Sequence, residues 1–291
     1  MDERDWLAER FQEQRGHLKA VAYRMLGSLA EAEDAVQDVW LRLSRSDTRE
    51  IDNLRAWLTT IVARVCLNRL RSRNARREQP MSVHVPDPIV GPDDALNPEH
   101  QAVLADSVGL ALQVVLDTLP PPERLAFVLH DMFDVPFDQI AAMMDRSPEA
   151  TRQLASRARR RVRGATPVSD GDLTRQRAVV DAFFAAARRG DFEALVAVLH
   201  PDIVLRSDGG PARPAVSRLV RGAAAVARSA IAFARPSAVI RPALVNGAAG
   251  VVSVEDGQPV SIMGFTVSDG KIVEIDAIAD PERLRQVGQS F

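Results

Sequence analysis

Several features are scarce in this 291-residue chain, and each scarcity excludes a class of protein. Its one cysteine, Cys66, cannot form a disulfide within the chain, which is typical of a reducing cytosol. The five histidines lack the spacing of metal ligands. No apolar run reaches the ~18 residues that a membrane span needs, and the acidic first residues do not resemble a secretory signal. We therefore expect a cytoplasmic, multidomain protein with no metal, no cofactor and no membrane partner.

Lysine is also scarce, since only two of the 37 basic residues are lysine, and the arginines are unevenly distributed. Residues 78–117 contain seven acidic side chains and no basic one. Seven arginines and no acid lie between residues 53 and 77, and six arginines and no acid between residues 150 and 163. Two such clusters, separated by an acidic segment, fit two contacts with one polyanion. A solvated helix face is the alternative that charge alone leaves open.

The spacing of apolar residues predicts three amphipathic helices within residues 1–77. Between residues 18 and 26, apolar side chains recur on one helix face. Ser28 and Glu31 form a capping-box pattern that opens a second helix, because the serine can accept from an unpaired amide and the glutamate can reach back. The inward positions of this helix are apolar, whereas Asp34 and Asp38 face outward.

A third helix is expected from about residue 54 to residue 73. Its buried face consists of four apolar residues: Leu54, Leu58, Ile61 and Val65. Its opposite face carries side chains that suit phosphates and unstacked bases: Thr60, Arg64, Asn68 and Arg71. Trp57 suits either base stacking or the core, and its spacing favours the core. Three helices with short connections predict a small bundle.

The middle of the chain contains a linker and a second helical block. Five prolines and no basic residue between residues 80 and 98 predict a linker rather than a packed element. Helices follow from about residue 101 to residue 163. Asp145-Arg146 forms a turn, and Ser147-Pro148 supplies an N-cap and a first-turn proline for a helix with a basic exposed face. This pattern predicts a helix-turn-helix whose second helix is the recognition helix.

The last block, residues 170–291, differs in kind from the two helical blocks. It begins with a helix over residues 175–189 and a shorter helix that ends near residues 200–201. Five short strands follow, at residues 203–206, 239–245, 250–254, 260–267 and 272–278. Three dipeptides mark turns between strands: Asn246-Gly247, Asp256-Gly257 and Asp269-Gly270. Helices followed by a meander of strands predict an α+β domain with its sheet curled around the helices.

Two segments carry a resemblance to a known family. Residues 22–27, 32–43 and 55–72 resemble region two of the extracytoplasmic-function (ECF) sigma factors of the sigma-70 family. Residues 119–124, 136–141 and 152–159 resemble region four of the same factors. The matches cover most of residues 10–163 in the expected order.

The resemblance implies a transcription initiation factor that binds core RNA polymerase and promoter DNA. It assigns core-polymerase binding to the second helix, with Asp34 and Asp38, although Asp34 also suits the dipole of that helix. It assigns the −10 element to the third helix and the residue before it: Asn53, Thr60, Arg64, Asn68 and Arg71. It assigns the −35 element to the recognition helix: Thr151, Arg152, Ser156, Arg157 and Arg160. The sequence alone does not sort the six arginines of that helix between bases and phosphates.

The last block resembles the SnoaL-like branch of the NTF2-like fold, on Gly190–Leu195, His200-Pro201-Asp202 and the loop at residues 208–210. A subgroup of these sigma factors has such an extension, with an aromatic-Leu-Pro-Glu-Pro linker motif that residues 84–88 match in part. Two further subgroup motifs are matched in part at residues 208–212 and 280–284. The resemblance implies a regulatory domain whose contact residues are Asp208, Gly209, Gly210, Asp280, Pro281 and Leu284.

The expected fold is therefore multidomain: two all-α helical domains followed by an α+β NTF2-like cone domain. Residues 1–77 would be sigma region two, 78–100 an acidic linker, 101–166 sigma region four and 170–291 the SnoaL-like domain. The acidic linker, with Asp87, Asp93 and Asp94, is expected to mimic nucleic acid in the RNA exit path. A small-molecule ligand and an anti-sigma protein are further candidate partners of the chain, and the C-terminal extension makes an anti-sigma protein less necessary.

Two other functions stay open from the residues alone. One is a DNA-binding helix-turn-helix regulator that does not join polymerase, which leaves the first 77 residues unexplained. The other is an NTF2-like enzyme with a pocket and an acid/base residue. Its candidate groups are Asp181, His200, Asp202 and Asp276, which form no recognisable dyad by spacing. We therefore expect no catalytic residues and a protein that is not an enzyme.

Overall fold

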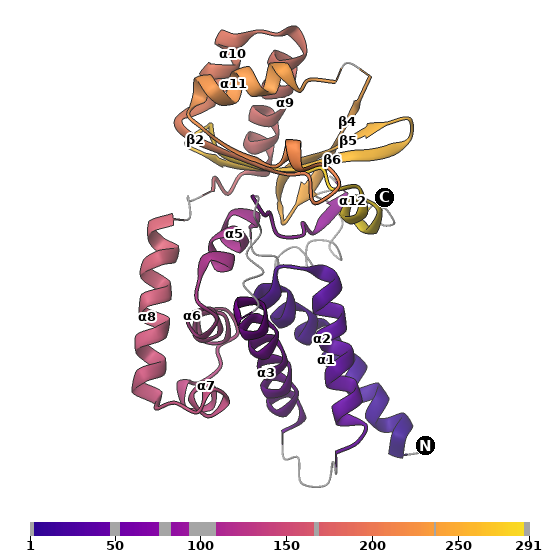
Figure 1. Cartoon of the computed structure of the whole chain (residues 1–291), viewed down its shortest axis with the longest axis vertical. Helices are drawn as coiled ribbons and strands as arrows, with labels where there is room; N and C mark the ends of the chain where they lie inside the picture. Colours follow the sequence, from indigo (N-terminus) through magenta and orange to yellow (C-terminus); the bar gives the residue numbers. More distant parts are fainter. Residues whose placement is uncertain are drawn as a thin grey trace. The chain divides into compact units, whose positions relative to one another are not determined.

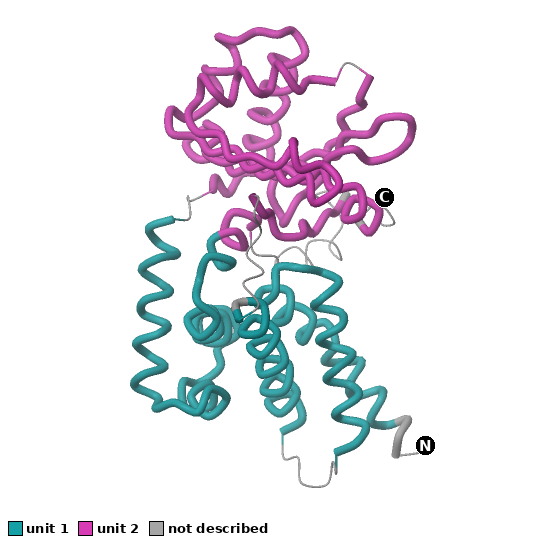
Figure 2. The backbone as a smooth tube through the Cα atoms, in the orientation of Figure 1, with its two compact units in different colours: residues 1–79, 115–165 teal, residues 80–114, 166–291 magenta. Residues whose placement is uncertain are grey.

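The computed structural model (Figure 1) describes residues 3–46, 53–75, 83–92, 109–165, 169–235 and 237–287. The chain divides into two compact units that alternate along the sequence (Figure 2). Unit 1 contains residues 1–79 and 115–165, and unit 2 contains residues 80–114 and 166–291. The four consecutive segments expected from the sequence are thus regrouped. The first sigma-like segment and the second from residue 115 onwards share unit 1, whereas residues 80–114, with most of the linker and the first half of helix α5 (Leu110–Thr118), belong to the same unit as the C-terminal domain.

The first part of unit 1 is a bundle of three helices, α1 (Glu3–Leu26), α2 (Leu29–Leu43) and α3 (Leu54–Ala75), each packed on the other two. Gly27, at a φ of 72°, ends α1 in the left-handed region that glycine adopts without strain. Ser28 then caps α2, because its hydroxyl accepts from the amide of Glu31 at 3.4 Å. The Glu31 carboxylate pairs with Arg73 of α3. The serine of the expected capping box is confirmed as the N-cap of α2. The glutamate instead links α2 to α3 through its ion pair with Arg73.

Helix α3 is buried more broadly than one apolar stripe predicts. Leu58 and Val65 are buried as expected, whereas Leu54 and Ile61 are half-buried. A second set of side chains in this helix is also buried: Thr59, Val62, Ala63, Cys66, Leu67 and Leu70. The reason is that α3 contacts α1 and α2 on one side and α6 and α7 of the second sigma-like segment on another.

The second part of unit 1 contains a helix-turn-helix. Helix α5 (Leu110–Thr118), whose first half belongs to unit 2, leads to α6 (Pro121–Phe127), the π-helical turn η2 (Val128–Met132), α7 (Phe137–Met144) and α8 (Pro148–Ala165). Asp145 ends α7 in the left-handed conformation, with φ 54° and ψ 49°. The Ser147 hydroxyl accepts from the amide of Ala150 at 3.2 Å and so caps α8. The expected turn, N-cap and first-turn proline are confirmed.

Unit 2 contains a seven-stranded sheet in the order β1-β4-β5-β6-β7-β2-β3. Its strands are β1 (Val90–Pro92), β2 (Leu199–Asp208), β3 (Arg218–Arg221), β4 (Val239–Val245), β5 (Ala248–Glu255), β6 (Gln258–Ser268) and β7 (Lys271–Ile278). Strands β4 to β7 form an antiparallel meander, and β2 pairs with β7 in parallel. The three expected turn dipeptides all join neighbouring strands with positive φ at both residues, as type I′ hairpins require.

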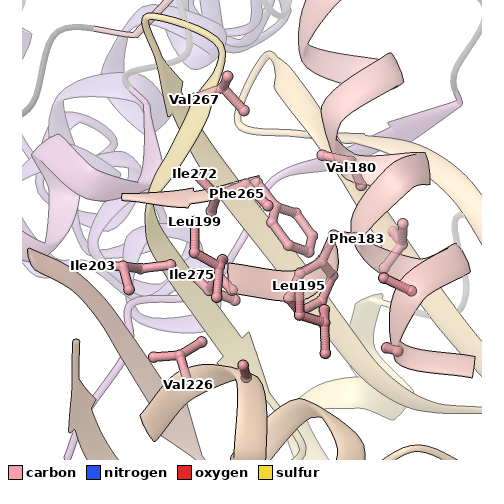
Figure 3. Packing of buried hydrophobic residues seen from close by; sticks show 14 of the residues in the cluster. Val180, Phe183, Leu195, Leu199, Ile203, Val226, Phe265, Val267, Ile272 and Ile275 are labelled. Carbon is pink, nitrogen blue, oxygen red and sulfur yellow. The ribbon is translucent and has the colours of Figure 1, made fainter. Parts of the chain in front are cut away.

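Helices α9 (Leu173–Arg189), α10 (Phe192–Val198) and α11 (Ala223–Ala232) cover one face of the sheet (Figure 1). Their apolar side chains interdigitate with those of the sheet, as Figure 3 shows for Phe183, Leu195 and Phe265. A second apolar cluster contains residues of β4 to β7, Leu110 of α5, Leu284 of α12 (Pro281–Val287) and Val85 of the linker. Because successive strand residues face opposite sides, the two clusters occupy opposite faces of the sheet.

Three expectations about this unit are corrected. Residues 83–92 pack against unit 2, with Val85 fully buried, because they extend the sheet by one strand and fill its second apolar cluster. The shorter helix ends at Val198, and His200-Pro201 belong to β2. A strand at Arg218–Arg221, which lacks a long apolar run, was not expected and pairs with β2 at the edge of the sheet.

Candidate nucleic-acid interface and linker site

The residues assigned to the −10 element lie along α3 and at its start. Asn53 is exposed, and its side-chain oxygen accepts from the amide of Ala56 at 3.0 Å, so it caps the helix. Asn68 and Arg71 are exposed, whereas Thr60 is half-buried and donates to the Ala56 carbonyl at 2.9 Å. The structure therefore places these side chains on one helix with most of them open to solvent.

Arg64 of the same set is exposed and donates to the carbonyl of Ala142 in α7 at 3.1 Å. Trp57, for which stacking and packing were both open, is half-buried.

The two aspartates assigned to core polymerase lie on the outward side of α2. Asp34 is exposed. Asp38 is half-exposed and accepts from Arg69 of α3 at 2.7 Å, so it forms an ion pair within the bundle. The acidic surface that α2 presents is accordingly centred on Asp34.

The residues assigned to the −35 element divide sharply by exposure. Arg152, Ser156, Arg157 and Arg160 are exposed on α8. Thr151 is fully buried, and its hydroxyl donates to the Ser147 carbonyl at 3.0 Å. The Thr151 side chain is therefore not open to DNA in this structure. A threonine in the first turn of a helix can satisfy its hydroxyl on the preceding turn, and this one faces the inside of the helix-turn-helix.

The structure divides the six arginines of α8 by their partners within the protein, and the division between base and phosphate contacts stays a prediction. Arg159 donates to Asp131 at 2.5 Å, and Arg161 donates to the buried Glu123 at 2.8 Å. Within the described part of the chain, no ion pair is formed by the other four, which are Arg152, Arg157, Arg160 and Arg163. Two arginines thus fasten α8 to η2 and α6, and four present their charge to solvent.

One of the exposed arginines is braced by an aromatic ring. The guanidinium of Arg152 lies 5.7 Å from the ring centre of Phe137, within the range of a cation–π contact. Phe137 in turn stacks on the ring of His130, at 3.7 Å between centres and an angle of 30°. This stack restricts Arg152 at the N-terminal end of the recognition helix, the end that reaches base edges in helix-turn-helix proteins.

Unit 2 binds the linker through one arginine of α12. Arg283 donates its Nε to Asp87 at 2.6 Å, one terminal nitrogen to Asp208 at 2.8 Å and the other to the Val85 carbonyl at 2.6 Å. Asp208 also accepts from the amide of Val85 at 3.0 Å and lies 3.3 Å from His84. Each charged group of this clamp therefore has an oppositely charged partner, which makes enclosure of the charges tolerable.

The linker continues from this clamp as a strand. Ile89 and Asn246 exchange two hydrogen bonds, of 2.9 Å to the Asn246 side chain and 2.7 Å to the Ile89 carbonyl. Val90 then pairs with Val245, and Pro92 with Ala243. The expectation that Asp87 lies in a polymerase channel is not supported by this geometry, because its carboxylate is buried against Arg283. Asp93 and Asp94 lie outside the described residues.

The residues assigned to regulation lie around the same clamp. Asp208 belongs to it directly, and the amide of Gly210 donates to Asp208 at 3.0 Å. Gly210 has a φ of 62°, and a Cβ there would collide with the carboxylate of Asp280. Asp280 accepts from the amide of Glu282 at 2.9 Å, at the start of α12. The two motifs, about 70 residues apart in sequence, are therefore packed together.

The rest of the assigned set has packing roles. Gly209 is buried and donates to Ser217 at 3.0 Å, Pro281 begins α12, and Leu284 fills the second apolar cluster. The contact residues inferred from the sequence do not include Arg283, although the motif at residues 280–284 contains it. The sequence signal for its role is that it is the one basic residue within that motif.

Electrostatics reinforce the clamp. Burial alone would raise the pKa of Asp208, but hydrogen bonds from His84 and two backbone amides, together with the charge of Arg283, hold it to about 2. A second enclosed arginine, Arg206, lies 3.1 Å from Glu274 and 3.2 Å from Asp276. Burial raises the pKa of Asp276 to about 7, with Glu274 adding to the effect and Arg206 opposing it.

The four groups considered for acid/base chemistry are not brought together. Asp181 and Asp202 are exposed, and His200 accepts from the amide of Asp202 at 3.1 Å. Asp276 alternates with Ile275, whose side chain belongs to the cluster between sheet and helices, so Asp276 faces the opposite side. Among the described residues no group of histidine, cysteine or carboxylate side chains could hold a metal ion. Likewise, no described helix is long and apolar enough to cross a membrane.

Comparisons with known proteins agree with this arrangement. Family models for Sigma-70 region 2, Sigma-70 region 4 and the SnoaL-like domain match residues 11–76, 109–162 and 180–275. The chain is 39% identical to the ECF RNA polymerase sigma factor SigJ of Mycobacterium tuberculosis, over 94% of this chain and 92% of that protein. It is 32% identical to a probable ECF sigma factor, SigI, of the same species, over 98% and 97%.

A solved structure extends the likeness to three dimensions. The crystal structure of M. tuberculosis SigJ superposes with a TM-score of 0.75 and 37% identity, covering 96% of this chain and 98% of that one. The order of the matched segments, two sigma regions and then a SnoaL-like domain, is the order of the elements described above. The chain therefore belongs to the ECF sigma factors of RNA polymerase, with a SnoaL-like domain at its C-terminal end.

Proposed function

We propose that this chain binds core RNA polymerase and directs it to promoters with −35 and −10 elements. Helix α2 contacts the polymerase through Asp34 and, in part, Asp38. The exposed side chains of α3 contact the −10 element, and Arg152, Ser156, Arg157 and Arg160 of α8 contact the −35 element. Arginine suits both tasks, because it pairs with phosphates and makes bidentate contacts with guanine.

The observation that supports the DNA-binding part best is the division of the arginines in α8. A helix whose arginines only formed a solvated face would have no need to be fastened on one side. Here Arg159 and Arg161 are bound to acidic partners on η2 and α6, and Arg152 is braced by Phe137. The remaining charge is concentrated on the exposed side of a helix-turn-helix, which is the docking geometry of this motif.

We further propose that unit 2 modulates initiation by holding the linker. The linker joins the two sigma regions along the chain, so its path limits how far they can separate. The clamp of Arg283, Asp208 and Asp87 and the strand β1 fix residues 84–92 on the sheet. Opening this clamp would lengthen the free chain between the two regions.

Transcription in vitro tests the initiation part. The full chain is mixed with core polymerase and a template that carries the promoter of its own gene. We expect specific initiation, and we expect Asp34→Lys to abolish binding to core polymerase while the protein stays folded. Gln12→Lys, an exposed change on α1, is the matched control. If the full chain neither binds core polymerase nor initiates, a DNA-binding regulator becomes the better account.

The regulatory part has its own test, with full-length variants only. Arg283→Ala removes the group that joins Asp87, Asp208 and the Val85 carbonyl, and Arg285→Ala removes an exposed neighbour on the same helix. We expect the first to change the amount of specific transcript at least threefold and the second to leave it unchanged. Equal transcription by both variants would remove the linker from the account of regulation.

A further inference from the structure

The basic residues of unit 2 are unevenly distributed along its sequence. Residues 170–291 carry fourteen basic and fourteen acidic side chains, but residues 209–254 contain six of the arginines and none of the acids. Within the described part of the chain, one of these six, Arg235, forms an ion pair. Two of the others, Arg218 and Arg221, are the first and last residues of strand β3. This strand therefore carries positive charge that no described carboxylate balances.

Strand β3 forms one edge of the sheet. It pairs with β2 on one side, and no described strand pairs with its other side. The amide of Gly222, directly after the strand, donates to the Ile203 carbonyl of β2 at 2.8 Å. Because the backbone groups of successive strand residues point in opposite directions, the amides and carbonyls of Leu219 and Arg221 point away from β2. The edge thus offers backbone donors and acceptors that an incoming strand can satisfy.

The side chains of β3 place charge on both faces of this edge. Successive residues face opposite sides of the sheet. Val220 packs in the apolar cluster beneath the helices, so Arg218 lies on that face as well. Leu219, which is 46% exposed, and the exposed Arg221 lie on the opposite face. An incoming strand would therefore meet one arginine on each face and an exposed apolar side chain between them.

Arg218 is oriented by an aromatic ring. Its guanidinium lies 3.6 Å from the ring centre of Phe233, which follows the last residue of α11 and is 53% exposed. The Nε atom of Arg218 is buried and has no hydrogen-bond partner among the described residues. A cation–π contact restricts a guanidinium without neutralising its charge. Arg218 is therefore held at the edge with its charge available to a carboxylate.

The acidic side chains of the neighbouring strands do not supply that carboxylate. Arg206 of β2 already pairs with Glu274 and Asp276 of β7. Asp208 belongs to the linker clamp. The other acid of β2, Asp202, is exposed and, within the described residues, forms no ion pair. The charge of the β3 edge is thus left for a partner from outside the domain.

We propose that β3 is a docking strand for an acidic, extended segment of another protein, which adds to the sheet beside it. Carboxylates opposite Arg218 and Arg221, with an apolar side chain opposite Leu219, make the three matching cross-strand pairs. For an antiparallel segment this corresponds to an acid, a small polar residue, an apolar residue and a second acid. The inference concerns unit 2 alone and does not depend on the proposed function.

Two other occupants suit the edge less well. A second copy of this chain, paired edge to edge about a two-fold axis, would place Arg218 of one copy opposite Arg221 of the other, and like charges opposite one another are destabilising. A nucleic acid would satisfy the arginines, but it has no strand backbone to pair with the edge and gains nothing from Leu219. The combination of free backbone groups, charge and one apolar side chain favours an acidic strand.

Fluorescence anisotropy of a labelled peptide tests the docking strand on the full-length chain. The probe is Ser-Thr-Glu-Thr-Val-Glu-Thr-Ser, whose central four residues have the matching pattern. We expect Arg218→Glu combined with Arg221→Glu to weaken binding at least tenfold, and a probe with lysines in place of the glutamates to bind this variant instead. Arg228→Glu with Arg241→Glu changes the net charge equally at exposed positions outside β3 and should alter binding less than twofold. Thermal unfolding verifies that both double variants are folded.

N-methylated probes separate strand pairing from charge attraction, and they use the unaltered chain. Methyl groups on the two probe amides opposite Leu219 and Arg221 remove the donors that face the edge, whereas methyl groups on the two alternate amides leave those donors in place. We expect the first probe to bind at least tenfold more weakly and the second to bind within threefold of the unmethylated one. Equal binding of the two methylated probes would overturn the docking strand.

Failure of the unmethylated probe to bind would also overturn the proposal, as would equal binding by the unaltered chain and the Arg218 and Arg221 reversal. A single-stranded oligonucleotide is the comparison ligand. If its affinity falls with that reversal while the peptide does not bind, the edge is a nucleic-acid contact and not a docking strand.

Discussion

The recognition helix α8 and the enclosed arginines of unit 2 use the same side chain in opposite ways. On α8, Arg157 and Arg160 are exposed. In unit 2, the side chain of Arg283 is 17% exposed and satisfies two carboxylates and a carbonyl, and that of Arg206 is 19% exposed beside two carboxylates. An exposed guanidinium contributes to affinity for a polyanion, whereas an enclosed one contributes to the stability of the fold. The partners, and not the arginine itself, decide which.

The largest expected effect concerns the enclosed arginines of unit 2. Arg283→Ala leaves Asp87 and Asp208 without their shared cation in a largely buried site, so we expect a loss of about 2–4 kcal/mol in the free energy of unfolding. Arg283→Lys should recover only part of it, because one ammonium group cannot meet three oxygens in the geometry of the guanidinium. Urea unfolding of the full-length proteins measures both. Arg285→Ala is the exposed control. A comparable loss of unfolding free energy in this variant would show that enclosure of an arginine does not decide its contribution to stability.

For the exposed arginines of α8 we predict a change in DNA binding without a change in stability. We expect Arg157→Ala with Arg160→Ala to weaken promoter binding by the holoenzyme about 10- to 100-fold and to lower the salt dependence by about one unit of slope for each phosphate that is no longer bound. The unfolding free energy should stay within ~0.5 kcal/mol, since both side chains are exposed. Filter binding at several salt concentrations separates these outcomes. An unchanged slope would show that neither arginine contacts DNA.

The dependence of stability on pH sharpens the difference between the two enclosed arginines. Asp208, beside Arg283, has a pKa of about 2 against 3.8 unperturbed, so its contribution is present above pH 4 and is lost as pH falls from 4 towards 2. Asp276, beside Arg206, has a pKa of about 7, so between pH 4 and 7 the folded state holds the extra proton. Its contribution to stability therefore falls as pH rises through this range.

Asp276→Asn replaces the titrating carboxyl with an amide that does not titrate, so the fall in stability between pH 4 and 7 should disappear. We expect the variant to gain stability over the unaltered chain as pH rises from 5 to 8, and Asp208→Asn to lose stability at every pH above 4. Thermal unfolding at fixed ionic strength across pH 3 to 8 measures the two slopes. Parallel profiles for Asp276→Asn and the unaltered chain would contradict the assignment.

The smallest effects are expected for the residues that fasten α8. Arg161 is half-exposed, so Arg161→Ala should cost about 0.5–1 kcal/mol of stability while leaving the salt dependence of DNA binding intact. Phe137→Leu removes the ring beneath Arg152 and should weaken binding to a promoter with an intact −35 element only a few-fold. The same change should have no effect on a template whose −35 element is scrambled. A loss of binding to both templates would indicate a general disturbance of α8.

Much of the fold is predictable because its signals are local. The serine caps at Ser28 and Ser147, the left-handed end of α7 and the three hairpin dipeptides depend on neighbouring residues only. They were therefore found where the sequence pattern indicated. The exposed arginines of α8 follow from helical spacing in the same way, although spacing did not show which of them meet acidic partners.

The linker is the clearest failure of local reasoning. Its prolines and acids indicate an unpacked segment, yet Val85 is fully buried and Asp87 is paired. The partners, Arg283 and Asp208, are more than 100 residues away in sequence, and nothing within the linker reports them. The burial of Thr151 was missed for a related reason, because a polar side chain that hydrogen-bonds to its own helix can point inward.

The sequence by itself determined the helices, the hairpins, the family and the two clusters of positive charge, because each is encoded in residues close together along the chain. Tertiary structure alone decided which arginines are enclosed, that the linker belongs with the SnoaL-like domain, and that Arg64 meets α7. These depend on charge pairs and apolar contacts between distant segments. Such contacts form only where the packed elements exclude water and bring matching groups within hydrogen-bond distance.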